Sequence, residues 1–189
     1  MVMGAKAPRL LLLCCLGLVI QAPPSLGQTP SKKISFPAGR IESASGEYWA
    51  EFITVKSHGD GSGEYRLVVR DKKNRKTATY DFDRSADAEW SKLSDSLVVN
   101  DYAGSSMFDC AVLADPAHEH QFQSLFKLLP KAGLPGWNPA DMAGHIYLTC
   151  QTWISPAALA VKVSGYDDTG RGFDHDLVYD LRGRALHSR

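Results

Sequence analysis

The chain carries no excess of charge of either sign, because its 21 Lys and Arg residues are matched by 21 Asp and Glu residues. It also lacks an apolar run that could cross a membrane. Such a helix needs about 20 residues, and the apolar segment Leu10–Ile20 has only 11. Nucleic-acid-binding domains concentrate positive charge on one face. We therefore expect no nucleic-acid partner, and no membrane-spanning segment in the mature protein.

Sequence motifs of enzymes and metal sites are absent as well. No Gly-x-Ser-x-Gly nucleophile elbow occurs, and Gly104-Ser105-Ser106 is expected in a turn between two strands. His118-Glu119-His120 lacks the i, i+4 spacing at which two imidazoles share a helix face and bind zinc. We expect no catalytic residue, no metal and no cofactor. The alternative is a small hydrolase in which His145 or His175 pairs with an aspartate brought close by folding.

The N-terminal residues have the three parts of a cleavable signal peptide. Lys6 and Arg9 form a short basic region, Leu10–Ile20 is apolar, and Ser25-Leu26-Gly27 places small residues where a signal peptidase cleaves. We predict that residues 1–27 are removed before Gln28. The mature protein is then exported to the periplasm or the extracellular space.

Two of the four cysteines, Cys14 and Cys15, lie inside the predicted signal peptide. An uncleaved anchor and a lipid-modified thiol are the alternatives here, although both cysteines lie early in the apolar run. Cleavage leaves 162 residues with 19 basic against 21 acidic side chains, a length typical of a single domain over residues 28–189. Its cysteines are Cys110 and Cys150.

Cys110 and Cys150 each fall on the apolar face of a segment whose apolar residues alternate with others, as in a half-buried strand. An oxidising compartment allows them to pair. We predict a Cys110–Cys150 disulfide, which would close a loop of about 40 residues. Two buried free thiols are the alternative.

The mature chain predicts a mostly β fold, an antiparallel meander or sandwich of blade-like hairpins. Aromatic and β-branched runs are separated by turn-forming clusters of Gly, Asp, Asn and Ser. The expected strands are 48–55, 65–70, 77–82, 97–100, 107–113, 145–152, 158–164 and 173–181. Their inward faces predict a core of Trp49, Phe52, Leu67, Val69, Trp90, Val99, Phe108, Val112, Leu148, Trp153, Leu159 and Val161.

One segment has a different period. Between Pro116 and Pro130, the apolar residues Phe122, Leu125, Phe126 and Leu129 recur at helical spacing. Proline suits the start of a helix and also ends one. We predict one amphipathic helix around residues 117–129.

Two segments of the chain are weakly similar to each other. Trp90-Ser91 leads through Ser94-Asp95-Ser96 into Leu97-Val98-Val99, and Trp153 leads in the same way into Leu159-Ala160-Val161. The first segment resembles the blade repeat of secreted β-propeller proteins. A propeller needs four to eight blades of about 40 residues. The resemblance therefore implies blade-like meanders in an open or sandwiched sheet rather than a closed propeller.

Two loops are candidates for recognition. The tetrapeptide Ser-Gly-Glu-Tyr occurs twice, ending at Tyr48 and at Tyr65, and aromatic side chains beside glycine turns suit protein contacts. The second loop contains Asn100, Asp101 and Tyr102. Local structural roles are the alternative for both, since Ser-Gly, Asn and Asp stabilise turns.

We expect a non-enzymatic exported domain that binds a protein or a component of the cell envelope. The Ser-Gly-Glu-Tyr element also resembles the Ser-Gly-x-x-Tyr loops of exported inhibitors of cell-wall enzymes, which is a second alternative to the hydrolase. Calcium could be held by the acidic stretch Asp167–Asp176, although its residue order differs from that of an EF-hand loop.

Overall fold

The computed structural model describes residues 33–37, 39–59, 62–134, 145–166 and 169–189. The predicted signal peptide and its cleavage site lie outside these ranges. The described part is mostly β, with strands in antiparallel meanders and one short helical element, which confirms the predicted fold class. None of its helices has the length and apolar character that crossing a membrane requires.

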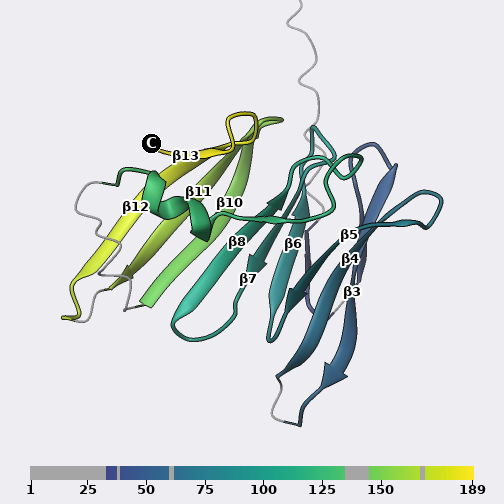
Figure 1. The fold of residues 1–189 in the computed structure, drawn as a ribbon, viewed down its shortest axis with the longest axis horizontal. Coiled ribbons are helices and arrows are strands. Elements are labelled where there is room, and N and C mark those ends of the chain that lie inside the picture. Colours follow the sequence, from purple (N-terminus) through teal and green to yellow (C-terminus); the bar gives the residue numbers. More distant parts are fainter. Residues whose placement is uncertain (1–32, 38, 60–61, 135–144, 167–168) are drawn as a thin grey trace, which may run out of the picture.

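The strands form three meanders, which lie side by side in Figure 1, and the N-terminal strand β1 joins the second of them. The first is the four-stranded sheet β2 (Arg40–Glu42), β3 (Tyr48–Ser57), β4 (Gly63–Asp71) and β5 (Lys76–Phe82). The second is β1 (Lys33–Ser35), β6 (Ala86–Trp90), β7 (Leu97–Asp101) and β8 (Met107–Leu113). The third is β10 (His145–Ser155), β11 (Ala158–Tyr166), β12 (Gly172–Asp180) and β13 (Ala185–Ser188).

The second and third meanders belong to one hydrogen-bonded sheet, but the junction between them is short. β8 and β10 run parallel and are paired only at Met107 with Ile146 and at Phe108 with Tyr147. Beyond this point β8 pairs instead with β9 (Gln123–Ser124). The two meanders therefore diverge after a shared edge.

Two apolar cores lie on either side of the second meander. The N-terminal core contains Leu97 and Val99 of β7 together with the inward side chains of the first sheet. The C-terminal core contains Val98 of β7 and the inward side chains of the third meander. Because side chains alternate along a strand, β7 contributes to both cores, and all its residues are buried.

Most of the predicted core is found buried. Nine of the twelve residues are buried, namely Phe52, Leu67, Val69, Trp90, Val99, Val112, Leu148, Leu159 and Val161. Trp49, Phe108 and Trp153 are less buried than these nine, although Trp153 still packs against the C-terminal core. Trp49 alternates with the inward residues Ala50 and Phe52, so it lies on the outer face, where the Arg40 guanidinium is 3.9 Å from its ring.

The predicted helix over residues 117–129 is shorter, later and of another type. The structure has a 3-10 helix, η1 (Phe126–Lys131), preceded by the short strand β9. The apolar residues of this segment divide between the two cores, since Phe122 packs against the N-terminal core and Leu125 and Leu129 lie in the C-terminal core. The apolar face of one helix cannot pack against both cores, because they lie on opposite sides of the second meander. Pairing of β9 with the open edge of β8 also satisfies the backbone there.

The two similar segments occupy equivalent places in their meanders. Trp90 is the cross-strand partner of Leu97 in the β6–β7 hairpin, and Trp153 is the partner of Leu159 in the β10–β11 hairpin. A third strand, β8 or β12, follows each hairpin and pairs antiparallel with it. The repeated pattern thus reflects a repeated three-stranded unit.

Candidate functional site

A pocket of about 460 Å³ opens at one end of the N-terminal core. It is lined by Val55 of β3, residues 63–66 of β4, residues 81–83 at the end of β5, and Asp101 and Ala103 at the end of β7. We call it the Asp101 pocket. It lies where the first meander faces the second, so both contribute side chains.

The apolar floor of the Asp101 pocket comes from rings that belong to the core. Tyr65 and Phe82 are each 6% exposed, and their ring centroids are 5.6 Å apart. Phe36, just after β1, contacts both rings, at 4.3 Å from Tyr65 and 5.3 Å from Phe82. The floor of the pocket is therefore part of the packed N-terminal core.

Gly63 makes room for this arrangement. A Cβ at Gly63 would meet the carbonyl oxygen of Lys56 and would lie 2.7 Å from the Tyr65 ring. The Gly63 amide also donates a hydrogen bond of 3.0 Å to the Asp83 carbonyl, which ties the start of β4 to the end of β5. Only glycine allows both the close approach of the strands and the observed position of Tyr65.

Asp101 is the least expected side chain in the pocket lining. It is only 8% exposed, and its Oδ2 accepts a hydrogen bond of 2.9 Å from the Tyr80 hydroxyl. Its Oδ1 is buried and has no hydrogen-bond partner. Buried polar atoms without a partner are rare, since each costs about 1–3 kcal/mol.

The surroundings of Asp101 disfavour its charged form. Burial raises the pKa of its carboxyl group to about 6, and the nearby negative charges of Asp83 and Asp109 act in the same direction. The Tyr80 hydrogen bond opposes this shift. Burial and the Asp101 charge also raise the pKa of Tyr80, so its phenol stays protonated and remains a donor.

The rim of the pocket is acidic. The described lining residues include four acidic side chains, namely Glu64, Asp81, Asp83 and Asp101, and one basic side chain, Arg66. The Arg66 guanidinium is committed to Asp81, with which it forms two hydrogen bonds. The pocket thus combines an apolar floor with a net negative rim.

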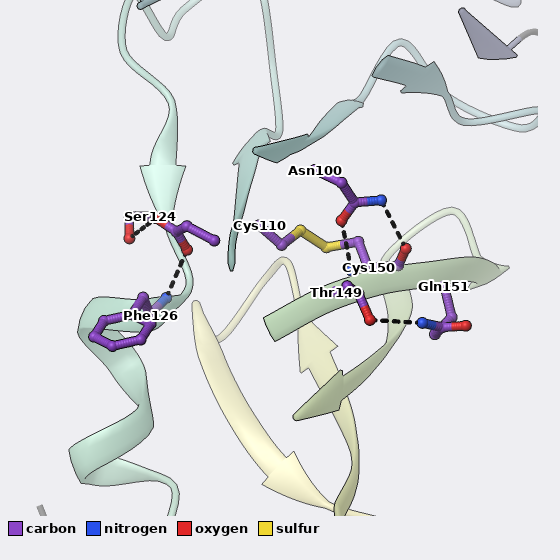
Figure 2. The surroundings of a disulfide bond; sticks show 8 residues. Asn100, Cys110, Ser124, Phe126, Thr149, Cys150 and Gln151 are labelled. Carbon is purple, nitrogen blue, oxygen red and sulfur yellow. Dashed lines mark hydrogen bonds between the residues drawn. A yellow bond between two sulfur atoms is a disulfide. The ribbon is translucent and has the colours of Figure 1, made fainter. Parts of the chain in front are cut away.

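Asn100, the preceding residue, points into the opposite core and has a structural role. Its side-chain amide accepts a hydrogen bond of 2.8 Å from the Cys150 amide and donates one of 3.1 Å to the Cys150 carbonyl. Cys150 is bonded to Cys110, whose Cα lies 5.8 Å away, and Figure 2 shows the three side chains together. The disulfide predicted from the sequence is present.

Tyr102 packs against the second meander. Its hydroxyl donates a hydrogen bond of 2.9 Å to Asp87, and its ring lies 5.1 Å from Phe108. The ring centroids of Phe108 and Tyr147 are 4.8 Å apart. Those of the stacked His145 and Tyr166 rings are 4.4 Å apart. Tyr166 is 39% exposed. A partly exposed group of aromatic rings therefore surrounds the β8–β10 junction.

The two Ser-Gly-Glu-Tyr copies have different structural roles. In the first, Gly46 has a φ of +73° in a turn, and Ser45 is hydrogen-bonded to the Asp95 carboxylate through its amide and hydroxyl. Tyr48, which follows, packs partly against the N-terminal core. In the second copy Tyr65 is buried rather than exposed, so it contributes to the pocket floor instead of an outer recognition surface.

A histidine–aspartate contact in the described residues lies on the surface of the protein. Asp115 contacts His118 at 2.8 Å, but both side chains are more than half exposed. The His145 ring bonds to the Ser105 carbonyl at 3.0 Å and the His120 ring to the Thr77 carbonyl at 3.0 Å.

Metal binding is likewise not favoured by the described residues. Three or more His, Cys, Asp or Glu side chains do not converge anywhere in them as a metal site would need. In the acidic stretch considered for calcium, Asp174 pairs with Lys162 at 2.9 Å. Asp167 and Asp168 lie outside the described residues.

The pocket joins residues that sequence reasoning treated separately. Tyr65 and Asp101 were candidates in two different loops, and they line the same cavity. Gly63 and Asp83 were missed as site residues, because a Gly before a strand and an Asp after one are ordinary turn residues. Comparison with known protein families, with curated proteins and with solved structures found no match for this chain.

Proposed function

We propose that this chain is an exported, non-enzymatic binding domain whose ligand site is the Asp101 pocket. Its ligand belongs to a protein or to a component of the cell envelope. The domain supplies a rigid apolar floor and an acidic rim, and no bond is made or broken at the site.

The cavity lined by Asp101 and by buried aromatic rings carries this proposal. The Asp101 carboxyl group is 8% exposed, accepts one hydrogen bond from Tyr80 and has its other oxygen buried without a partner, an arrangement that costs stability. The cavity has a volume of about 460 Å³, and a ligand that enters it would meet this acidic residue beside the rings of Tyr65 and Phe82. Ligand sites typically combine such an apolar cavity with a few placed polar groups.

Export is supported by the Cys110–Cys150 disulfide and by the signal-like N-terminus. Mass spectrometry of the protein from its native compartment should find an N-terminus at Gln28. An intact Met1 would contradict this part of the proposal.

An inhibitor of a cell-wall enzyme is one form that such a binding domain can take. The exposed apolar residues Ile53 and Val55 near the end of β3 favour contact with a protein surface beside the pocket. In Figure 1 the β3–β4 hairpin extends past the neighbouring strands, which leaves this surface accessible.

The ligand site can be tested without knowing the ligand. Two-dimensional proton–nitrogen NMR spectra of the mature domain would be recorded with mixtures of neutral, cationic and anionic fragments. At least one fragment should shift the amide signals of Gly63, Tyr65 and Ala103 and leave those of β12 and β13 unchanged. A screen in which no fragment of any charge shifts pocket signals would overturn the proposal.

A further inference from the structure

We infer that the open edge of β3, residues 53–57, pairs with an extended segment of a partner protein, which adds a strand to the first sheet. This inference rests on the proposed function and deepens it, because it names the partner as a protein and the bound part as an uncharged extended strand. The open edge borders the Asp101 pocket, since Val55 also lines that cavity.

The main chain of β3 is paired to different lengths on its two sides. On one side β4 accompanies it to its end, where Ser57 lies opposite Gly63. On the other side β2 accompanies it only as far as Glu51. In the part of the chain that the structure describes, no strand pairs with this second side beyond that point. Residues 53–57 therefore present backbone donors and acceptors in a row, and another extended main chain is the chemistry that matches such a row.

The side chains of the open edge are accessible and partly apolar. All five residues are exposed, including the β-branched Ile53 at 36% and Val55 at 50%. Side chains of this kind stabilise sheets by packing against the residues of a neighbouring strand. Apolar side chains of an added strand would cover Ile53 and Val55 and remove them from water.

The charge along the open edge favours an uncharged strand. Lys56 is the single charged residue among residues 53–57, and its cross-strand partner in β4 is Glu64. Charges of opposite sign therefore lie side by side at this edge. A charged residue of either sign in the added strand would be repelled by one of them.

The shape of the open edge disfavours a second copy of this chain as its occupant. The register between β3 and β4 shifts between Thr54 and Lys56, which leaves Val55 without a direct partner in β4. A symmetric dimer would pair the open edge with itself, so the two irregular stretches would meet. Irregular pairing and exposed lysines are also the features that keep sheet edges from pairing with their own copies. A strand of another protein, which has its own register, is therefore the favoured occupant.

The test compares two acetylated and amidated pentapeptides that have the same alternating Thr and Val side chains. One has ordinary backbone amides, and in the other every amide nitrogen is methylated and cannot donate a hydrogen bond. Hydrogen exchange of the mature domain is followed by NMR during titration with each peptide. At a concentration of about ten times Kd, the first peptide should slow the exchange of the outward-facing amides in residues 53–57 about tenfold. It should leave β12 and β13 unchanged, and the methylated peptide should have no effect.

A pair of variants locates the peptide on the protein. Ile53→Lys removes an apolar contact and adds a charge to the open edge, so it should weaken peptide binding about tenfold. The control Ile154→Lys makes the same change in β10, at a side chain that is 49% exposed, and should leave the affinity unchanged. Both side chains are exposed, so both variants should fold. Equal weakening by the two variants would overturn the inference.

The remaining outcomes separate the inference from the proposed function. If the methylated peptide protects the edge as strongly, the contact is not main-chain pairing, and the inference is overturned. If neither peptide slows exchange, the inference is also overturned, and the fragment screen decides the proposed function through the signals of Gly63, Tyr65 and Ala103. Analytical ultracentrifugation of the domain alone should find a monomer. A dimer that Ile53→Lys dissociates would identify a second copy as the occupant and overturn the inference.

Discussion

The side-chain amide of Asn100 forms two hydrogen bonds with the backbone of Cys150, at 2.8 Å and 3.1 Å, 50 residues further along the chain. The side-chain amide thereby makes the same pair of hydrogen bonds with β10 that the backbone of a neighbouring strand would make. Cys110, the cross-strand partner of Asn100 in β8, is covalently bonded to the same Cys150. Besides the short β8–β10 pairing, the second and third meanders are therefore connected at Cys150 by a disulfide and by a hydrogen-bonded side chain (Figure 2).

Replacing Asn100 by Asp should destabilise the domain by about 2–4 kcal/mol, since the new carboxylate cannot donate to the Cys150 carbonyl and a buried charge is added. The measurement is the free energy of unfolding in urea at pH 7. Gln151→Glu is a matched control, because it makes the same chemical change at an exposed neighbour of Cys150, and it should change the stability by less than about 0.5 kcal/mol. If the two variants lowered the free energy of unfolding by the same amount, the hydrogen bonds of Asn100 would not contribute to stability.

Replacing both Cys110 and Cys150 by Ser should lower the stability by about 4 kcal/mol, because the bridge closes a loop of 40 residues. Hydrogen exchange should rise first in residues 116–134, which lie inside the loop that the bridge closes. Titration of the unfolded, unreduced protein with a thiol reagent is the direct check of the bond. Two free thiols in material from the native compartment would contradict the disulfide.

Trp90→Ala and Trp49→Ala form a matched pair that tests the two faces of the sheets. Trp90 is 1% exposed and its indole donates to the Ile41 carbonyl at 3.3 Å, so its truncation should cost about 3–5 kcal/mol. Trp49 is partly exposed beneath Arg40, and its truncation should cost about 1 kcal/mol or less. Thermal or urea unfolding measures both. Similar losses would contradict the assignment of faces.

Asp101 makes the stability of the domain fall as the pH rises from about 4 to 6. Its pKa is raised from 3.8 to about 6 on folding, so the folded state binds the extra proton in this range. This contribution is fully present below pH 4 and lost above pH 6, a difference of about 2–3 kcal/mol. Relative to Asp101→Asn, the wild-type protein should therefore lose stability across this range. A constant difference between the two proteins would be the contrary result.

The alternation of apolar residues predicted the meanders well, because a strand with one buried face imposes a period of two on its sequence. It predicted the wrong element around Leu125, since residues at helical spacing there pack into two cores on different sides of the second meander. The period alone does not say which core receives each side chain. Trp49 was predicted on the inner face for a related reason. The sequence shows that it is aromatic, but not that Arg40 covers its ring on the outer face.

The disulfide was predictable, because the predicted export and the strand positions of the two cysteines both favoured pairing. The pocket was only partly predictable. Tyr65 and Asp101 were identified in separate loops, but their meeting depends on how the first and second meanders face each other, which no local pattern encodes. That Asp101 would be buried with one oxygen unpartnered follows only from the tertiary contacts of Tyr80 and its neighbours.

The central claim is that Asp101 is a buried carboxyl group in the wall of a ligand-binding cavity. Its ionisation can be measured directly. The carbon-13 chemical shift of the Asp101 carboxyl carbon would be followed by NMR between pH 3 and pH 8 in the ligand-free mature domain. The account predicts a midpoint near the pKa of about 6 that burial beside Asp83 and Asp109 imposes. A midpoint at or below the ordinary aspartate pKa of about 4 would contradict it, since Asp101 would then be well solvated or already paired.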